Sequence, residues 1–349
     1  MNEYTSSVKV YGALLLVELI FGVWPIVAKL SLREGLSACS FVFYRCLGTS
    51  LVLVCIQFCR EGRFYLPTKS LGVFGVPAQS CEKKIVAAEF ALVGLLSVGN
   101  FGGYILGVDL AGSFLTSLVQ PMMPVMACFF SVVIGLEPVR LLKVMGIAVS
   151  VAGSMYIVSV ERRKSFEMMN LSWLGILALT SNVVCSALYH TLMKIALVSY
   201  GEVYLTMWTY IISATVFCVV SIFAVDTVPM PWTLSHLGML GLAYAVLLTS
   251  SFNYLTIAWA NKATNPSTVT VFSCLQPCVA GIAAYAAFNE TQDLSLIFGG
   301  AVIICGLFLT VYGQAQQDGL RESLALVSAE KNSMTYATCN GAPSKTQPV

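Results

Sequence analysis

The first residue that could do chemistry is a carboxylate in a place where charges are rare. Glu18 lies between Val17 and Leu19, inside an apolar run at about 10–32 that is long enough to span a bilayer. A carboxylate there is costly in lipid, so its side chain should face a cavity or a partner. Its role is either that of a substrate or proton ligand, or that of a tether between helices. We expect Arg45, in the next apolar run, to be a structural cation that lies deep enough to pair with Glu18.

Neutral polar side chains recur in other apolar runs at helical spacing. Asn100 and Tyr104 are four residues apart, so they share one face of a helix. Asn253 and Tyr254 occupy the corresponding run in the second part of the chain. Each residue alone is explained by a hydrogen bond between helices. Their recurrence at equivalent places favours a shared polar cavity.

Two glutamines stand beside residues that disrupt helices. Gln120 and Gln276 directly precede prolines, which leave backbone carbonyl groups unpaired. Such groups are tolerated inside a membrane protein where they line a cavity or meet a neighbour. Asn182, in a further apolar run, extends the polar set. The predicted substrate-binding residues are Glu18, Asn100, Tyr104, Gln120, Asn182, Asn253, Tyr254 and Gln276.

No enzyme is indicated. The sequence contains no HExxH, GxSxG or P-loop motif, and its two histidines, His190 and His236, pair with no nucleophile by spacing. The 12 cysteines form no CxxC pair, and most lie in apolar runs, so they are interpreted as apolar filler. We therefore expect no catalytic residue, no metal and no cofactor. The net charge of +2 argues against a nucleic-acid partner.

The composition places these residues in a membrane protein. Apolar residues make up 57% of the 349-residue chain and charged residues only 10%. A soluble domain has roughly 25% charged residues and could not hide so much apolar surface. Spanning a bilayer takes about 20 helical residues. Runs of that size lie at about 10–32, 37–59, 85–108, 112–134, 142–160, 171–195, 203–225, 237–260, 264–288 and 294–313. The sequence therefore predicts an all-α membrane protein of ten helices.

The basic residues predict the orientation. With ten spans, 13 Lys and Arg residues lie on the side of the two termini and 5 on the other. The positive-inside rule then places both termini in the cytoplasm. The ends would be a short cytoplasmic segment at 1–9 and a polar cytoplasmic tail at 314–349, for which we expect flexibility.

An internal repeat divides the chain. A shift of 153 residues superposes five distinctive pairs: Asn100 on Asn253, Pro124 on Pro277, Glu137 on Glu290, Gly146 on Gly299 and Gly153 on Gly306. We therefore expect two five-helix repeats, at 10–160 and 171–313. An odd number of helices per repeat makes the repeats inverted. Inverted repeats are typical of alternating-access carriers, although duplication could also serve only to build a stable bundle.

Several segments resemble a known family. The stretch from Ala28 to Ser37, followed by Phe41-Val42-Phe43-Tyr44-Arg45, resembles the opening of plant EamA-type transporters. These form the walls-are-thin-related, nodulin-like branch of the drug/metabolite transporter superfamily. Gly135-Leu136-Glu137-Pro138 and Asn289-Glu290, each followed by two glycines, resemble the end of an EamA repeat. The segment from Asn265 to Pro277 resembles the ninth helix, whereas the first half lacks the proline often found near 110–113.

The resemblance implies a carrier with a central cavity between its halves. Its solutes would be amino acids, auxin-like acids or other small metabolites, with protons as a candidate coupling ion and a homodimer as a candidate assembly. Sugar-phosphate or nucleotide-sugar exchange is the alternative, together with a non-transporting interaction protein. Relatives that carry phosphate esters use basic cavity residues, and only Lys29, Arg45 and Lys194 are candidates for that role. The expected location is the plasma membrane or an endomembrane such as the vacuole.

Overall fold

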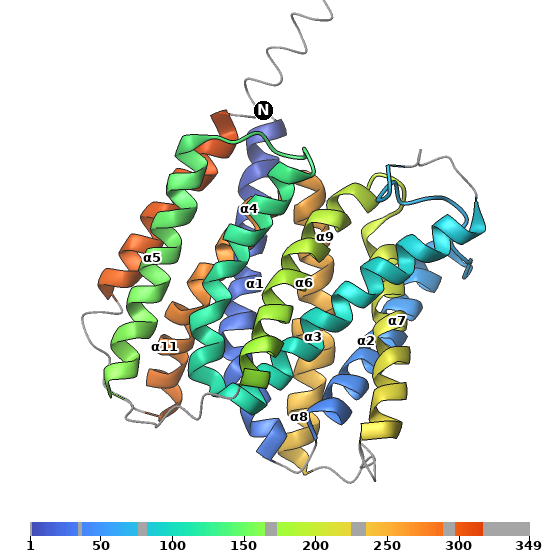
Figure 1. Cartoon of the computed structure of the whole chain (residues 1–349), viewed down its shortest axis with the longest axis horizontal. Helices are drawn as coiled ribbons and strands as arrows, with labels where there is room; N and C mark the ends of the chain where they lie inside the picture. The colour runs from blue at the N-terminus through green and yellow to red at the C-terminus, as the bar shows by residue number, and fades with distance from the viewer. Residues whose placement is uncertain are drawn as a thin grey trace, which may run out of the picture.

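The protein is described by a computed structural model that covers residues 2–33, 37–75, 82–164, 173–224, 235–288 and 297–316. In these ranges all regular secondary structure is helical (Figure 1). The elements are α1 (Asn2–Arg33), α2 (Ala38–Glu61), α3 (Lys83–Val119), η1 (Gln120–Met122), α4 (Met123–Val133), α5 (Leu141–Lys164), α6 (Trp173–Ala196), α7 (Glu202–Ala224), α8 (His236–Tyr244), η3 (Ala245–Phe252), α9 (Asn253–Ala263), α10 (Pro266–Val271), η4 (Phe272–Leu275) and α11 (Gln276–Phe288). A last helix covers Ile297–Gln316.

The helix lengths confirm the ten-helix membrane protein. Among the described residues, 9 helices are long and apolar enough to cross a membrane, and Gln120–Val133 is a shorter apolar helix. One boundary differs from the expectation, because the fourth span does not begin at 112. Instead α3 continues to Val119, and the α-helix is interrupted at Gln120 and Pro121. Proline has no backbone N–H and its ring collides with the preceding turn, so it ends a helix more effectively than Gly112 does.

Serine, glycine and proline residues determine where several helices begin or end. Ser37 caps α2 by accepting a hydrogen bond from the backbone N–H of Ser40, and Ser235 caps α8 in the same way from Gly238. Gly62 ends α2 with φ of 67°, a left-handed conformation that glycine adopts without strain. Pro266 occupies the first turn of α10, where its missing N–H costs nothing.

Helices from the two ends of the chain interleave. In the described residues α1 packs against α9 and α11, α2 against α7, and α3 and α4 against α6. Figure 1 shows that α1 begins, and Ile297–Gln316 ends, at the same end of the bundle. Each half therefore lacks a core of its own, and its polar residues meet those of the other half in the middle.

The glycines of the repeat make a close crossing between α5 and the last helix. A β-carbon at Gly146 would lie 2.8 Å from the carbonyl oxygen of Gly306, and one at Gly153 would lie 3.0 Å from that of Gly299. Small residues allow helix backbones to approach this closely in a membrane. A shift of 153 residues converts each contact into the other, as a pseudo-two-fold axis requires. Glu290, another member of the repeat, falls outside the described residues.

The buried face of α1 carries the first candidate residue. Leu14, Val17 and Glu18 are buried, whereas the neighbouring Leu15 and Leu19 are exposed. This alternation follows the helical period, so the exposed leucines face lipid and Glu18 faces the protein interior.

Candidate functional site

A cavity of about 80 Å³ lies among α1, α2, α3, α6, α9 and α11. Seven of the eight predicted residues line it, namely Glu18, Asn100, Tyr104, Gln120, Asn182, Tyr254 and Gln276. Helices from both ends of the chain contribute to the wall.

Four of these side chains form one hydrogen-bonded chain. The amide of Gln120 donates to the Asn182 side-chain oxygen over 2.7 Å, and the Asn182 amide donates to the Asn100 side-chain oxygen over 2.9 Å. The Asn100 amide in turn donates to the hydroxyl of Tyr254 over 3.1 Å. Both interpretations of these residues hold, since they join helices and they line a cavity. An amide chain with each member satisfied holds its donors and acceptors in fixed directions.

Among the described residues, Glu18 has one side-chain hydrogen-bond partner. Its carboxylate accepts from the side-chain amide of Gln276 over 2.8 Å, and its side chain is 4% exposed. It forms no ion pair with a described residue. The expected pairing with Arg45 is therefore wrong. The two side chains come from α1 and α2, and each turns to a neutral partner on a helix of the second half.

Arg45 is held by a hydroxyl and by aromatic rings. Its Nε donates to the Ser250 hydroxyl over 2.6 Å. The guanidinium carbon lies 5.0 Å from the ring centre of Trp24 and 5.3 Å from that of Phe101. Such cation–π contacts stabilise a positive charge away from water. The sequence analysis did not include Arg45 among the substrate-binding residues, although the structure places it in the cavity wall.

Irregular backbone positions Ser250. It lies in η3, a π-helical segment between α8 and α9 within the eighth span. A π segment adds an extra residue to each turn and occurs often at functional sites. Here it brings Ser250 to Arg45 and starts α9 so that Tyr254 faces the cavity.

One predicted residue lies elsewhere. Asn253 is fully buried but does not line the cavity, and its amide donates to the carbonyl of Val17 over 3.2 Å. The repeat superposes Asn100 on Asn253, but no hydrogen bond joins the two side chains among the described residues. Asn100 is bonded to Tyr254, the next residue along the helix. The repeat predicted the right turn of the helix but not the right side chain, because the π segment rotates α9.

The cavity residues lie in a region that matches a known family. Residues 8–159 and 173–312 match the model of the EamA-like transporter family. The chain belongs to this family. It is 21% identical over 309 residues to a WAT1-related protein of Arabidopsis thaliana, covering 85% of each chain. It is also 22% identical over 344 residues to the Arabidopsis thaliana protein WALLS ARE THIN 1, covering 89% of this chain and 85% of that protein.

A solved crystal structure has the same fold. It superposes with a TM-score of 0.69 at 13% sequence identity, covering 87% of this chain and 98% of the other. The protein is thus an integral multi-pass membrane protein of a transporter family. Its substrate does not follow from these similarities.

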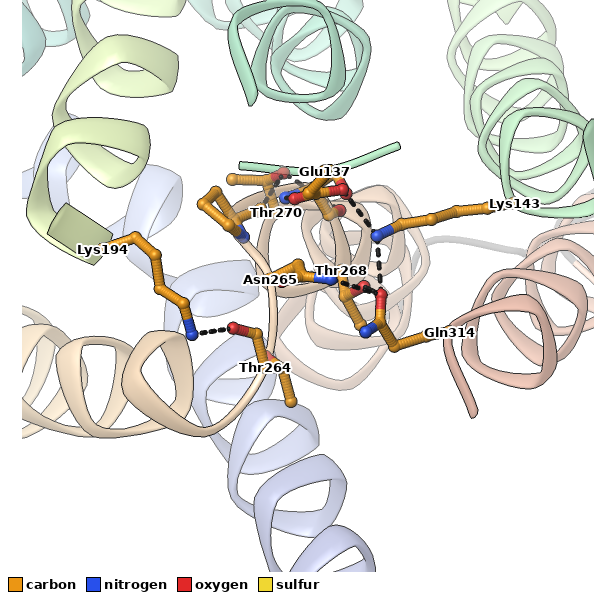
Figure 2. Close-up of polar contacts among 10 residues, drawn as sticks. Glu137, Lys143, Lys194, Thr264, Asn265, Thr268, Thr270 and Gln314 are labelled. Atoms are coloured by element: carbon orange, nitrogen blue, oxygen red, sulfur yellow. Dashed lines mark hydrogen bonds and ion pairs between the residues drawn. The ribbon is translucent and has the colours of Figure 1, made fainter. Parts of the chain in front are cut away.

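A second group of buried charges lies at the end of this EamA-like transporter where α1 begins. Figure 2 shows the Lys143 amino group between the Glu137 carboxylate, at 2.7 Å, and the Gln314 amide oxygen, at 2.8 Å. Glu137 also accepts from the backbone N–H and the hydroxyl of Ser267 at the start of α10. Asn265 donates to Gln314 over 2.8 Å. We call these five residues the Glu137 cluster; they link the α4–α5 connection, α5, the last helix and the start of α10.

The lysine that the sequence analysis considered for anion binding has a structural role. Lys194 donates to the backbone carbonyls of Asn261, Lys262 and Thr264 at the end of α9 (Figure 2 draws the bond to Thr264). A lysine at this position donates hydrogen bonds to the backbone carbonyls at a helix end, which have no partner within the helix. The side chain of Lys29, the other candidate, lies outside the described residues. Among the described residues, Arg45 is the only Lys or Arg in the cavity wall of this EamA-like transporter.

Several wall residues were missed by the sequence analysis. They are mostly apolar or hydroxyl-bearing, such as Phe21, Trp24, Met123, Ser186, Thr270 and Ser273. Such residue types are common on any membrane helix, so only the tertiary structure distinguishes them. His190, one of the two histidines of the chain, also lines the cavity. Arg45 had a usable signal, since a cation within an apolar run needs a polar environment.

Proposed function

We propose that the protein is a secondary transporter that carries small metabolites, amino acids or small organic acids, by alternating access. The observation that carries this proposal is the buried polar cavity, to which helices of both halves contribute. A structural bundle would have no reason to enclose an amide chain, a carboxylate and a guanidinium around an open space, because each buried polar group costs free energy.

The moving units would be the two repeats at 10–160 and 171–313. At one end, the Glu137 cluster joins residues of both repeats and would have to separate for the cavity to open there. Away from that end, a smaller pocket lined by Pro25, Thr116 and Ala280 shares Tyr104, Gln120 and Gln276 with the cavity. It supports a route to the opposite side.

Glu18 is the candidate for proton coupling. It lines the cavity, is buried, and has no cation to keep it ionised among the described residues. A carboxylate that is exposed alternately to the two sides could couple proton movement to solute movement.

A phosphate ester is a poorer solute for this cavity. Phosphate groups carry up to two negative charges and are usually met by several cations. The described wall has a single Arg and no Lys. A non-transporting interaction protein remains the other alternative to be tested.

Flux through the purified protein in liposomes tests the proposal. Vesicles preloaded with unlabelled solute would be screened against labelled amino acids, organic acids and nucleotide sugars. Counterflow of an amino acid or organic acid supports it, and the same vesicles without protein are the control. Flux of nucleotide sugars alone would support the alternative, and no flux of any solute would contradict transport.

The orientation has its own test. We propose that both termini lie in the cytoplasm, because 13 basic residues fall on their side against 5 on the other. Tags on Met1 and Val349 should both be cleaved by a protease added to the cytoplasmic side of sealed vesicles. Cleavage of only one tag would contradict the topology.

A further inference from the structure

Arg45 is a buried cation without a buried anion. Its side chain is 3% exposed, and it forms no ion pair with any described residue. A guanidinium has five N–H donors. Only Nε is used, by the Ser250 hydroxyl, and the terminal Nη groups have no acceptor among the described residues. The structure therefore places four strong donors at a cavity wall where no described residue accepts from them.

This arrangement is costly unless something else completes it. Moving a charge out of water costs several kcal/mol when no counter-charge is present, on the order found for buried ions in proteins. The rings of Trp24 and Phe101 offset part of that cost, but aromatic faces accept no directed hydrogen bond from the Nη groups. Ser250 fixes one edge of the guanidinium and leaves the other edge available.

The available edge matches one chemical group best. The two Nη groups form a planar fork that pairs with both oxygens of a carboxylate. The rest of the wall combines apolar side chains, such as Phe21, Met123 and Ile257, with neutral amide and hydroxyl groups. A solute with one carboxylate and an otherwise uncharged body would satisfy both features.

We propose that Arg45 is the specificity-determining residue of the cavity and binds the carboxylate of a monocarboxylate solute. Ser250 is the positioning residue, because it holds the guanidinium edge from the π segment. The inference rests on the proposed transport function, and it adds which group of the solute is recognised and by which side chain. Glu18 has no part in binding the carboxylate.

Ligand binding to the purified full-length protein in detergent tests the proposal. Three molecules share one skeleton: L-leucine has a carboxylate and an ammonium, 4-methylpentanoate has only the carboxylate, and 3-methylbutylamine has only the ammonium. In a buffer free of carboxylates, leucine and 4-methylpentanoate should raise the thermal stability of the wild type, since a ligand of the folded state stabilises it. The amine and glucose 6-phosphate should not.

The variants give the second readout. Arg45→Gln should weaken binding of both carboxylates by about 30-fold or more, as expected when one partner of a buried charge pair is removed. Arg45→Lys keeps the charge without the fork and should weaken binding by about tenfold. Arg60→Gln is the matched control, because Arg60 is exposed in the last turn of α2, about four helical turns from Arg45. Its ion pair with Glu202 spans 3.7 Å.

Each outcome decides the question. Stabilisation by the amine or by glucose 6-phosphate equal to that by leucine would overturn the proposal. So would wild-type affinity in Arg45→Gln, or no stabilisation by either carboxylate. If Arg45→Gln does not fold, the wild-type series decides alone. Carboxylate binding without flux in liposomes would contradict the proposed transport and support this inference. Flux that does not depend on whether the solute has a carboxylate would support transport and contradict this inference.

Discussion

Two regions of the protein bury opposite charges, and they treat them differently. In the Glu137 cluster, the Lys143 amino group lies 2.7 Å from the Glu137 carboxylate, and both residues have further hydrogen bonds. In the central cavity, Glu18 and Arg45 are equally buried but do not pair, and each has one neutral side-chain hydrogen bond.

The difference distinguishes a structural charge from one that is available to a ligand. A buried ion pair with complete hydrogen bonds offsets its own desolvation and has nothing left to offer. Separate buried charges with unused donors or acceptors remain unsatisfied until a solute, a proton or water completes them. Burial and charge are the same in both regions, so only the partners reveal the role.

Breaking the paired region should have the largest effect. Lys143→Met leaves the Glu137 carboxylate buried without its cation, which typically costs about 3–5 kcal/mol. We expect a low yield of monodisperse protein and a strongly reduced Tm in detergent. The double variant Glu137→Gln with Lys143→Met should recover much of the loss, because no charge remains unpaired. A Tm for Lys143→Met equal to that of the wild type would show that the cluster contributes no net stability.

Removing a neutral polar group from the cavity should lower stability less than removing Lys143 from its ion pair. Asn182→Ala removes the middle of the amide chain and leaves the Gln120 side-chain amide and the Asn100 side-chain oxygen each without a partner. The expected cost is about 1–3 kcal/mol, the penalty for an unsatisfied buried polar group. Solute affinity should fall as well, measured as the KM of flux.

Asn253→Ala is the matched control for Asn182→Ala. Asn253 is as buried as Asn182, but its amide bonds only the Val17 carbonyl and it lies outside the cavity wall. KM should therefore stay close to the wild-type value. Equal KM changes in the two variants would remove the distinction between cavity and packing asparagines.

Replacing the unpaired carboxylate should change function more than stability. Glu18→Gln keeps a side chain that can bond Gln276 and removes a charge that has no counter-ion among the described residues. We expect normal yield with flux that no longer responds to a pH gradient. Gradient-driven flux indistinguishable from the wild type would end the coupling hypothesis.

The smallest loss of stability is expected for the unpaired cation. Arg45→Met removes a buried charge that has no ion pair among the described residues and keeps an apolar chain against Trp24 and Phe101. Its free energy of unfolding should fall by no more than about 1 kcal/mol, and it should rise if the desolvation cost of the charge exceeds the stabilisation by the two rings. A loss as large as that of Lys143→Met would mean that Arg45 is structural, as the sequence analysis first assumed.

The sequence determined the class of the protein and much of the wall. Bilayer thickness demands about 20 apolar residues per helix, so composition and run length alone predicted ten membrane helices. Polar residues are expensive in lipid, so their presence in apolar runs predicted seven of the cavity residues. Both inferences depend on the cost of placing each residue type in lipid, which follows from the amino-acid sequence alone.

Only the tertiary structure decided which polar groups meet. Arg45 and Ser250 are 205 residues apart, and Glu18 and Gln276 are 258 apart, so no local pattern could pair them. The π segment turned Tyr254, and not Asn253, toward Asn100, although the repeat favoured the asparagine. Helical spacing predicts the face on which a side chain lies. The partner that it finds depends on the rotation and depth of another helix, which are set by packing across the whole bundle.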